Sequence, residues 1–173
     1  MNKTIREITT LLDLGKVTSS ELVDAAIEEI EKEKGQGQTT FIKSYPDQAK
    51  AQAIAINKLR ASGVVVSPIA GIPISIKDLF DVAGEITTAG SLVRKMCAPA
   101  IQDADIVKKL RSAGAIVMGR TNMTEFAFSG LGLNPHYGTP LNPWDRETSR
   151  IPGGSSSGAA ISVSDNMAVA GIG

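Results

Sequence analysis

The sequence contains an apolar run that ends in two charged residues, Gly71-Ile72-Pro73-Ile74-Ser75-Ile76-Lys77-Asp78. Short runs rich in Val and Ile are typical of buried β-strands. Similar runs occur on either side of it, at Val64–Val66 and Ala115–Met118, and a helical pattern covers Asp103–Ala113. Strands that alternate with helices indicate an α/β fold. The stretch therefore predicts a strand of an α/β sheet with Lys77 at its end.

The segment before this strand is predicted to be mainly helical. Apolar residues recur at helical spacing in Thr4–Leu14, and Thr18-Ser19-Ser20-Glu21 has the pattern of a capping box that starts a second helix. A third helix is expected over Asp47–Ser62, and a short strand at Phe41-Ile42. In the third helix we expect one buried face, formed by Ala51, Ile54, Ala55 and Leu59.

The segment after the strand is predicted to alternate further. Gly114 stands where a left-handed residue ends the Asp103–Ala113 helix, and a short helix capped by Asn122 is expected within Thr121–Gly130. Prolines without periodicity predict a loop over Asn134–Pro152. Ser157–Ser164 alternates only weakly, whereas Met167–Ile172 is expected to be a buried, central parallel strand. Because the sequence ends in that strand, we expect the chain to be cut short.

Composition excludes several classes of protein. The 173 residues carry 18 Lys and Arg against 18 Asp and Glu, which gives no basis for nonspecific nucleic-acid binding. The single cysteine, Cys97, is interpreted as a small buried apolar residue, and with one histidine no zinc site is expected. No signal peptide or membrane span is expected. These features favour a cytoplasmic protein without metal or other cofactor.

Two features could carry chemistry. A lysine held among apolar neighbours has its pKa lowered, so that the neutral amine can act as a base. The alternative is that Lys77 is exposed and forms an ion pair with Asp78.

The second feature is a glycine- and serine-rich stretch, Gly153-Gly154-Ser155-Ser156-Ser157-Gly158. It could be a plain turn, or a loop that aims hydroxyls at a ligand. His136 is interpreted as a hydrogen-bonding loop residue. Together, lysine and serines are the parts of a hydrolase that needs no histidine.

These motifs occur in order with others, namely Thr87-Thr88-Ala89-Gly90-Ser91, Asp103-Ala104, Gly119-Arg120-Thr121-Asn122-Met123 and Asn142-Pro143-Trp144. From Gly71 to Gly173 the chain resembles the amidase signature family. The resemblance implies a mixed sheet flanked by helices, in which residues 1–63 form a helical arm and residues 64–173 begin the signature core. It also implies an amidohydrolase that uses a Ser-cisSer-Lys relay and an acyl-enzyme on small-molecule amides.

The resemblance assigns roles to particular residues. Lys77 matches the family's catalytic lysine, and Ser155 matches the bridging serine, whose hydroxyl is expected to point at the lysine from a cis peptide at Gly154–Ser155 or Ser155–Ser156. The segment Phe126, Ala127, Phe128, Ser129 and Gly130 matches a stretch that lines the acyl pocket. Ser157 departs from the family's usual glycine. The family's nucleophile lies in a Gly-Thr-Asp-Thr-Gly-Gly-Ser stretch that these 173 residues do not contain.

Two other functions stay open. One is the glutamine-hydrolysing subunit of a tRNA-dependent amidotransferase, although the continuation Gly158-Ala159-Ala160-Ile161-Ser162 looks more like free-standing amidases. The other is a noncatalytic α/β interaction module, in which Lys77 could be exposed and protonated. An amidase relay requires instead a buried Lys77 within hydrogen-bond reach of Ser155. A homodimer is also left open.

Overall fold

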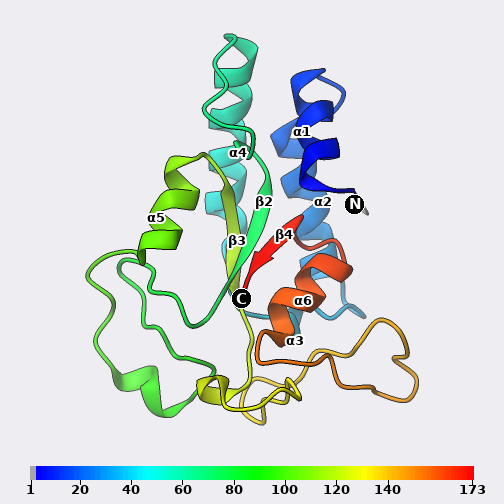
Figure 1. Ribbon diagram of the computed structural model, residues 1–173, viewed down its shortest axis with the longest axis vertical. Coiled ribbons are helices and arrows are strands. Elements are labelled where there is room, and N and C mark those ends of the chain that lie inside the picture. Colours follow the sequence, from blue (N-terminus) through cyan, green and yellow to red (C-terminus); the bar gives the residue numbers. More distant parts are fainter. Residues whose placement is uncertain (1–2) are drawn as a thin grey trace.

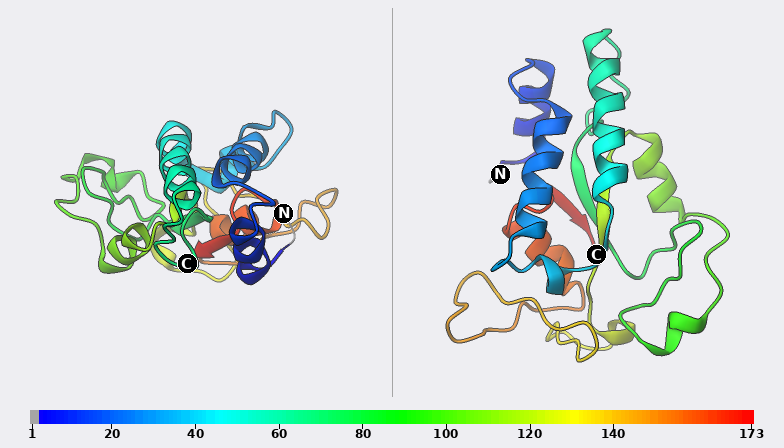
Figure 2. Two further views of the ribbon diagram at one scale, coloured as in Figure 1. Left: turned by 90° about the horizontal axis from the view of Figure 1, so that it is seen from above. Right: turned by 180° about the vertical axis from the view of Figure 1, so that it is seen from behind.

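The computed structural model describes residues 3–173, which form a four-stranded sheet with helices on both faces (Figures 1 and 2). The strands are β1 (Phe41–Ser44), β2 (Pro73–Lys77), β3 (Ile116–Thr121) and β4 (Ala170–Ile172), in the spatial order β1-β3-β2-β4. β2 runs parallel to β3 and β4, and β1 runs antiparallel to β3. The mixed α/β sheet predicted from the sequence is confirmed.

The helices are α1 (Ile5–Asp13), α2 (Ser19–Glu31), α3 (Gly37–Thr40), α4 (Pro46–Ala61), α5 (Asp105–Ser112) and α6 (Ser157–Ser164). Two short 3-10 turns, η1 (Val93–Met96) and η2 (Glu125–Ala127), lie in the long connections. α2 begins at the predicted capping box, in which Thr18 and Glu21 satisfy each other's backbone N–H groups. Gly114 has φ +79° after α5, as the C-cap prediction requires.

The side chains of β2 alternate between two environments. Ile74 and Ile76 belong to an apolar cluster with residues of α1 and α5, and a second cluster joins α2 and α4 to the Ile116 and Met118 side of β3. α2 and α4 lie side by side on that face (Figure 2). Ser75 points away from Ile74 and Ile76, and its hydroxyl meets that of Ser162 on α6 at 2.8 Å. Lys77, two residues later, therefore faces the same side as α6.

Both long connections lie at one end of the sheet. Residues 78–104 follow the carboxyl end of β2, and residues 122–156 follow that of β3 (Figure 1). Because β2 and β3 are parallel, their last residues lie next to each other, with Lys77 opposite Thr121. In parallel sheets, ligand sites usually lie at the carboxyl ends of the strands.

The buried face of α4 differs from the sequence prediction. Ala49 and Ala53 are fully buried in the cluster with α2, whereas Ala51, Ile54, Ala55 and Leu59 are exposed. The helix carries alanine or isoleucine on more than one face, so its sequence is compatible with either of two buried faces. The small Ala49 and Ala53 face α2 and the sheet, and the more apolar stripe is left outside.

Other local predictions are also wrong. Val64–Val66 forms no strand and is about half exposed, because β-propensity needs a neighbouring strand to pair with. Within Thr121–Gly130 only the three-residue turn η2 forms, and it has no side-chain cap. Ser157–Ser164, for which the weak alternation predicted no element, is a helix. The parallel strand predicted within Met167–Ile172 is present as β4 and pairs with β2, but it is shorter, only partly buried and at the end of the sheet order rather than central. Cys97 is exposed, not buried.

The proposed division at residue 63 has no independent test in the structure. β1 lies within residues 1–63, yet it pairs with β3, which belongs to the later part of the chain. Its residue Phe41 also shares an apolar cluster with Ile116 and Met118 of β3. The division into a helical arm and a signature core therefore stays a prediction, although both parts contribute to one sheet.

Candidate active site

Lys77 lies at the end of β2 with only 5% of its surface exposed. Its Nζ donates hydrogen bonds to Ser155 Oγ at 2.8 Å and to Ser156 Oγ at 2.9 Å. Among the residues that the structure describes, no carboxylate forms a salt bridge with Lys77. The amine is thus held by neutral hydroxyl groups alone.

The serine loop reaches Lys77 through a special backbone geometry. The Gly154–Ser155 peptide bond is cis, and Gly153 has φ +78°. Gly154 cannot be replaced freely, since a Cβ there would lie 2.7 Å from the backbone N of Gly132. Ser155 is further fixed by its carbonyl, which accepts a hydrogen bond of 3.0 Å from Thr124 N. The sequence prediction of a cis peptide with a serine hydroxyl turned toward Lys77 is confirmed.

Burial lowers the pKa of Lys77 below its ordinary value, and desolvation is the cause. A buried amine without a counter-charge favours its neutral form, because the ammonium ion loses its hydration. The alternative in which Lys77 is exposed and paired with Asp78 is wrong. Asp78 points to the opposite face of the strand and forms its ion pair with Arg120.

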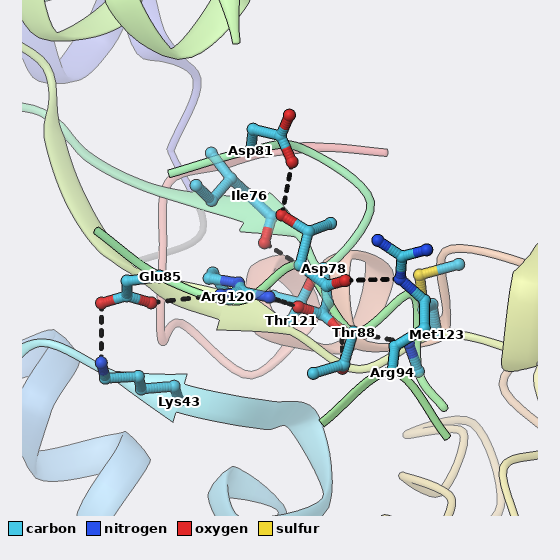
Figure 3. A network of polar contacts seen from close by, with 12 residues as sticks. Lys43, Ile76, Asp78, Asp81, Glu85, Thr88, Arg94, Arg120, Thr121 and Met123 are labelled. Atoms are coloured by element: carbon cyan, nitrogen blue, oxygen red, sulfur yellow. Dashed lines mark hydrogen bonds and ion pairs between the residues drawn. The ribbon is translucent and has the colours of Figure 1, made fainter. Parts of the chain in front are cut away.

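Asp78 is the centre of a separate network of polar contacts (Figure 3). Its carboxylate is fully buried and accepts hydrogen bonds from the hydroxyl of Thr88 and from Gly90 N, the latter at 3.0 Å. The paired guanidinium of Arg120 is also buried, with 3% of the residue exposed. The backbone of Asp78 contributes too, since its N–H donates to Thr121 O at 3.1 Å. Asp78 therefore anchors the chain immediately after Lys77.

The network extends from Arg120 to Glu85 at the edge of the sheet. Glu85 accepts hydrogen bonds from Arg120 Nη1 at 3.1 Å, from the Tyr45 hydroxyl at 2.7 Å and from Lys43 Nζ at 2.7 Å. Burial and the adjacent Glu85 carboxylate raise the pKa of Tyr45. Acids and bases are balanced here, so this network stabilises the fold and offers no uncompensated amine.

The predicted acyl-pocket segment begins within η2, which contains Phe126 and Ala127. Phe126 is 52% exposed and Phe128 is 93% exposed. Phe126 and Ala127 have φ +50° and +57°, in the left-handed region that non-glycine residues rarely adopt, and Phe126 N donates to Ala89 O at 2.9 Å. Ser129 and Gly130 complete the segment, and the part of the chain immediately before it contacts the serine loop through Thr124.

The remaining candidates lie elsewhere. His136 Nε2 lies 3.1 Å from Glu125 Oε1, in agreement with its predicted role as a hydrogen-bonding loop residue. Ser157, the departure from the family pattern, is buried in the first turn of α6. Within residues 3–173 no cluster of three or more His, Cys, Asp or Glu side chains could hold a metal ion. No helix of that part of the chain is long and apolar enough to span a membrane.

A family model described as Amidase matches residues 21–173, which is most of the chain and includes every residue of this site. The chain belongs to the amidase signature family. It is 38% identical over 173 residues to a glutamyl-tRNA(Gln) amidotransferase subunit of Chromohalobacter salexigens, covering 99% of this chain and 34% of that protein. It is 44% identical over 117 residues to the AtzE component of the 1-carboxybiuret hydrolase of Pseudomonas sp. strain ADP, covering 68% of this chain and 25% of that protein.

Solved structures of this amidase family agree with the fold. A complex described as vestigial, which reveals the evolutionary origins of an s-triazine catabolic enzyme, matches with TM-score 0.88 and 36% identity over 96% of this chain and 36% of that chain. The native peptide amidase of Stenotrophomonas maltophilia matches with TM-score 0.81 and 32% identity over 96% of this chain and 35% of that chain. The chain spans about a third, 34%, of the length of the curated amidotransferase relative.

The sequence did not predict every contact of this candidate site. It placed Ser155 next to Lys77 but gave Ser156 no contact with the amine, although the doubled serine in the loop was a signal for it. It also gave Asp78 no partner of its own beyond the lysine. Arg120 lies 42 positions later in the sequence, and a lone basic residue in a strand does not indicate which carboxylate it meets.

Proposed function

We propose that this chain carries the proton-relay half of an enzyme that hydrolyses carboxylic amides. The observation that carries the proposal is the buried Lys77, whose Nζ lies 2.8 Å from Ser155 Oγ in surroundings that lower its pKa. A general base needs this combination of hydrogen-bond reach and a population of the neutral form. Membership of the amidase family supports the same chemistry.

In the proposed mechanism neutral Lys77 accepts the proton of Ser155 Oγ. Ser155 in turn takes a proton from a nucleophilic serine outside these 173 residues, as that serine attacks the amide carbonyl carbon. The C–N bond then breaks, and the proton returns along the relay to the leaving amine. Water, deprotonated along the same relay, releases the acid from the acyl-enzyme, which restores both serines.

The proposed substrate is a small molecule with a linear carboxylic amide. We propose that Phe126, Ala127, Phe128, Ser129 and Gly130 contact its acyl part, and the exposure of Phe126 and Phe128 supports this placement because both rings are available for contact. The proposal requires neither a metal nor another cofactor. It places the protein in the cytoplasm, since one cysteine cannot form an internal disulfide.

The second candidate is the glutamine-hydrolysing subunit of a tRNA-dependent amidotransferase. The 38% identity that extends along 99% of the chain to a glutamyl-tRNA(Gln) amidotransferase subunit favours it, whereas the Gly158–Ser162 continuation looks more like free-standing amidases. Glutaminase activity that requires added partner subunits would support this candidate. Hydrolysis of simple amides by the unpartnered protein would favour a free-standing amidase. The third candidate, a noncatalytic module, is disfavoured because Lys77 is buried.

Kinetics in a full-length amidase that contains these residues test the relay. Lys77→Ala should lower kcat by roughly 10²- to 10⁴-fold, the usual contribution of a general base, and leave KM nearly unchanged. Ser155→Ala should act the same way. The double variant should cost little more than the worse single variant, because residues of one relay are not additive. A change confined to KM, or fully additive losses, would reject the relay.

The 173-residue polypeptide alone provides a further test. We expect no amide hydrolysis from it, since Lys77 and Ser155 cannot supply the attacking group while they relay protons. Loss of one oxyanion donor alone typically costs roughly 3 kcal/mol in the transition state. Ammonia release from aliphatic and aromatic amides is the measurement. Release at an enzymatic rate that disappears in Lys77→Ala would place the nucleophile within these residues, at Ser156 or Ser157.

A further inference from the structure

Gly90 lies between two buried polar side chains, those of Asp78 and Asn134. Its N–H donates to the Asp78 carboxylate at 3.0 Å, and its carbonyl accepts from Asn134 Nδ2 at 2.8 Å. Gly90 has φ +68°, and a Cβ added to it would lie 2.9 Å from both Asn134 Nδ2 and Met123 O. No larger residue fits without displacing these neighbours. The position is therefore a tight junction between Asp78 and Asn134.

Asn134 joins its own turn to two other segments through the hydrogen bonds of its side-chain amide. It is 2% exposed, and its Nδ2 donates to Gly90 O and to Met123 O, both at 2.8 Å. Its Oδ1 accepts from His136 N at 2.8 Å and from Tyr137 N at 3.1 Å. A buried amide with both groups satisfied holds its partners firmly, because any displacement leaves a polar group without a partner. Asn134 thus clamps the segments that contain Gly90 and Met123.

We call Asn134 and its hydrogen bonds to Gly90 and Met123 the clamp. Two sets of contacts connect this clamp to the Ser155 loop. Met123 precedes Thr124, whose N–H donates to Ser155 O at 3.0 Å. Gly132, two residues before Asn134, packs against the serine loop so closely that a Cβ on it would clash with Gly153 O. On the other side of the junction, Asp78 follows Lys77 directly. Both partners of the Lys77–Ser155 contact are therefore attached to the same clamp.

We propose that Asn134 is a positioning residue, which holds the Ser155 hydroxyl against Lys77 through Met123–Thr124 on one side and Gly90–Asp78 on the other. This inference rests on the proposed function, in which that contact is the proton relay. It extends the site to a residue whose side-chain hydrogen bonds go to neither the amine nor the serines. Without the clamp, the serine loop can move away and water can reach Lys77.

The test is a titration of Lys77 in the 173-residue chain, followed by the ¹³Cε NMR signal that Lys77→Met removes. In Asn134→Ala we expect the pKa of Lys77 to rise toward the ordinary lysine value of about 10.4, because water replaces the lost enclosure. Gly90→Ala places a methyl group against Asn134 Nδ2 and Met123 O, which disturbs the same contacts. It should therefore also raise the pKa of Lys77.

Asn57→Ala is the matched control. Asn57 is a partly buried asparagine of α4, and its side chain accepts from Ser19 N at 2.9 Å and donates to Ser20 Oγ at 2.7 Å, both on α2 and not on the serine loop. It should lower stability and leave the titration of Lys77 unchanged. A general loss of stability does not alter the pKa of a residue in molecules that remain folded, so the control separates positioning from simple structural support.

Each outcome decides between the claims. If Lys77 of the unaltered chain titrates at the ordinary lysine value, the proposed function fails, and the positioning role fails with it. If that pKa is lowered but neither Asn134→Ala nor Gly90→Ala raises it, only the positioning role is overturned. An equal shift in Asn57→Ala would also overturn it. Should both junction variants fail to fold, rapid hydrogen exchange of Thr124 N–H in the unaltered chain would contradict the clamp, and strong protection would support it.

Discussion

Lys77 and Asp78 are neighbours in the sequence and both are buried, yet they point to opposite faces of the sheet and meet opposite surroundings. Asp78 receives an arginine, a threonine hydroxyl and a backbone N–H. Among residues 3–173, the Lys77 amine forms side-chain hydrogen bonds only with the hydroxyls of Ser155 and Ser156. One charge is fully compensated and the other is not.

The difference shows how one strand end can serve both stability and chemistry. A buried charge with good partners stays ionised, and losing a partner is costly because the remaining ion cannot be hydrated. A buried amine without a counter-ion instead shifts toward its neutral form. Asp78, whose charge is compensated, fixes the backbone at the end of β2. Lys77, whose charge is not compensated, is held by that fixed backbone and can act as a base.

The largest expected effect comes from breaking the compensated side. Arg120→Met removes the partner of Asp78 and leaves a buried carboxylate unpaired. We expect the free energy of unfolding to fall by about 3 to 5 kcal/mol. Urea unfolding of the 173-residue chain, followed by circular dichroism, measures this loss.

Lys43→Met is the control, because Lys43 pairs with Glu85 of the same network but its side chain is 56% exposed. An exposed ion pair contributes about 0 to 1 kcal/mol, so this variant should be nearly as stable as the unaltered chain. Equal losses in the two variants would show that burial does not distinguish the pairs, and the comparison between the two faces would lose its basis.

A smaller effect sharpens the comparison from the other side. The folded chain lowers the pKa of Lys77, so between that value and the ordinary value of about 10.4 the unfolded chain binds more protons than the folded one. Stability contributed at Lys77 must therefore increase as pH rises through this window and stay constant below it. Lys77→Met lacks this gain.

The stability difference between the unaltered chain and Lys77→Met should therefore change in favour of the unaltered chain with rising pH. Urea unfolding of both proteins at a series of pH values up to about 10.4 measures it. Tyr45 and the other titrating groups are common to both chains and cancel in the difference. Curves that run parallel throughout would mean that Lys77 has the same pKa folded and unfolded.

Local patterns predicted much of this fold and part of the site. The capping box at Thr18, the left-handed Gly114 and the strand that ends at Lys77 depend on neighbouring residues, so the sequence displays them directly. The contact between Lys77 and Ser155 spans 78 positions and was predictable only from several family motifs that occur in order.

The sequence predictions that were wrong or missing depend on contacts between distant segments, which a local sequence pattern does not specify. α4 has apolar residues on two faces, and contact with α2 decides that Ala49 and Ala53 are the buried ones. Val64–Val66 has the composition of a strand but no strand beside it. Asn134 looks like an ordinary loop residue in the sequence, because the carbonyls it binds belong to segments that only the fold brings together.

The central claim is that Lys77 is an uncompensated, buried amine held against Ser155. Its pKa in the unaltered 173-residue chain tests this most directly, through the ¹³Cε signal that is absent from Lys77→Met. We predict a midpoint clearly below the ordinary lysine value of about 10.4, and a further change when Ser155→Ala removes a hydroxyl from its surroundings. A midpoint at or above that value, unaffected by Ser155→Ala, would contradict the claim.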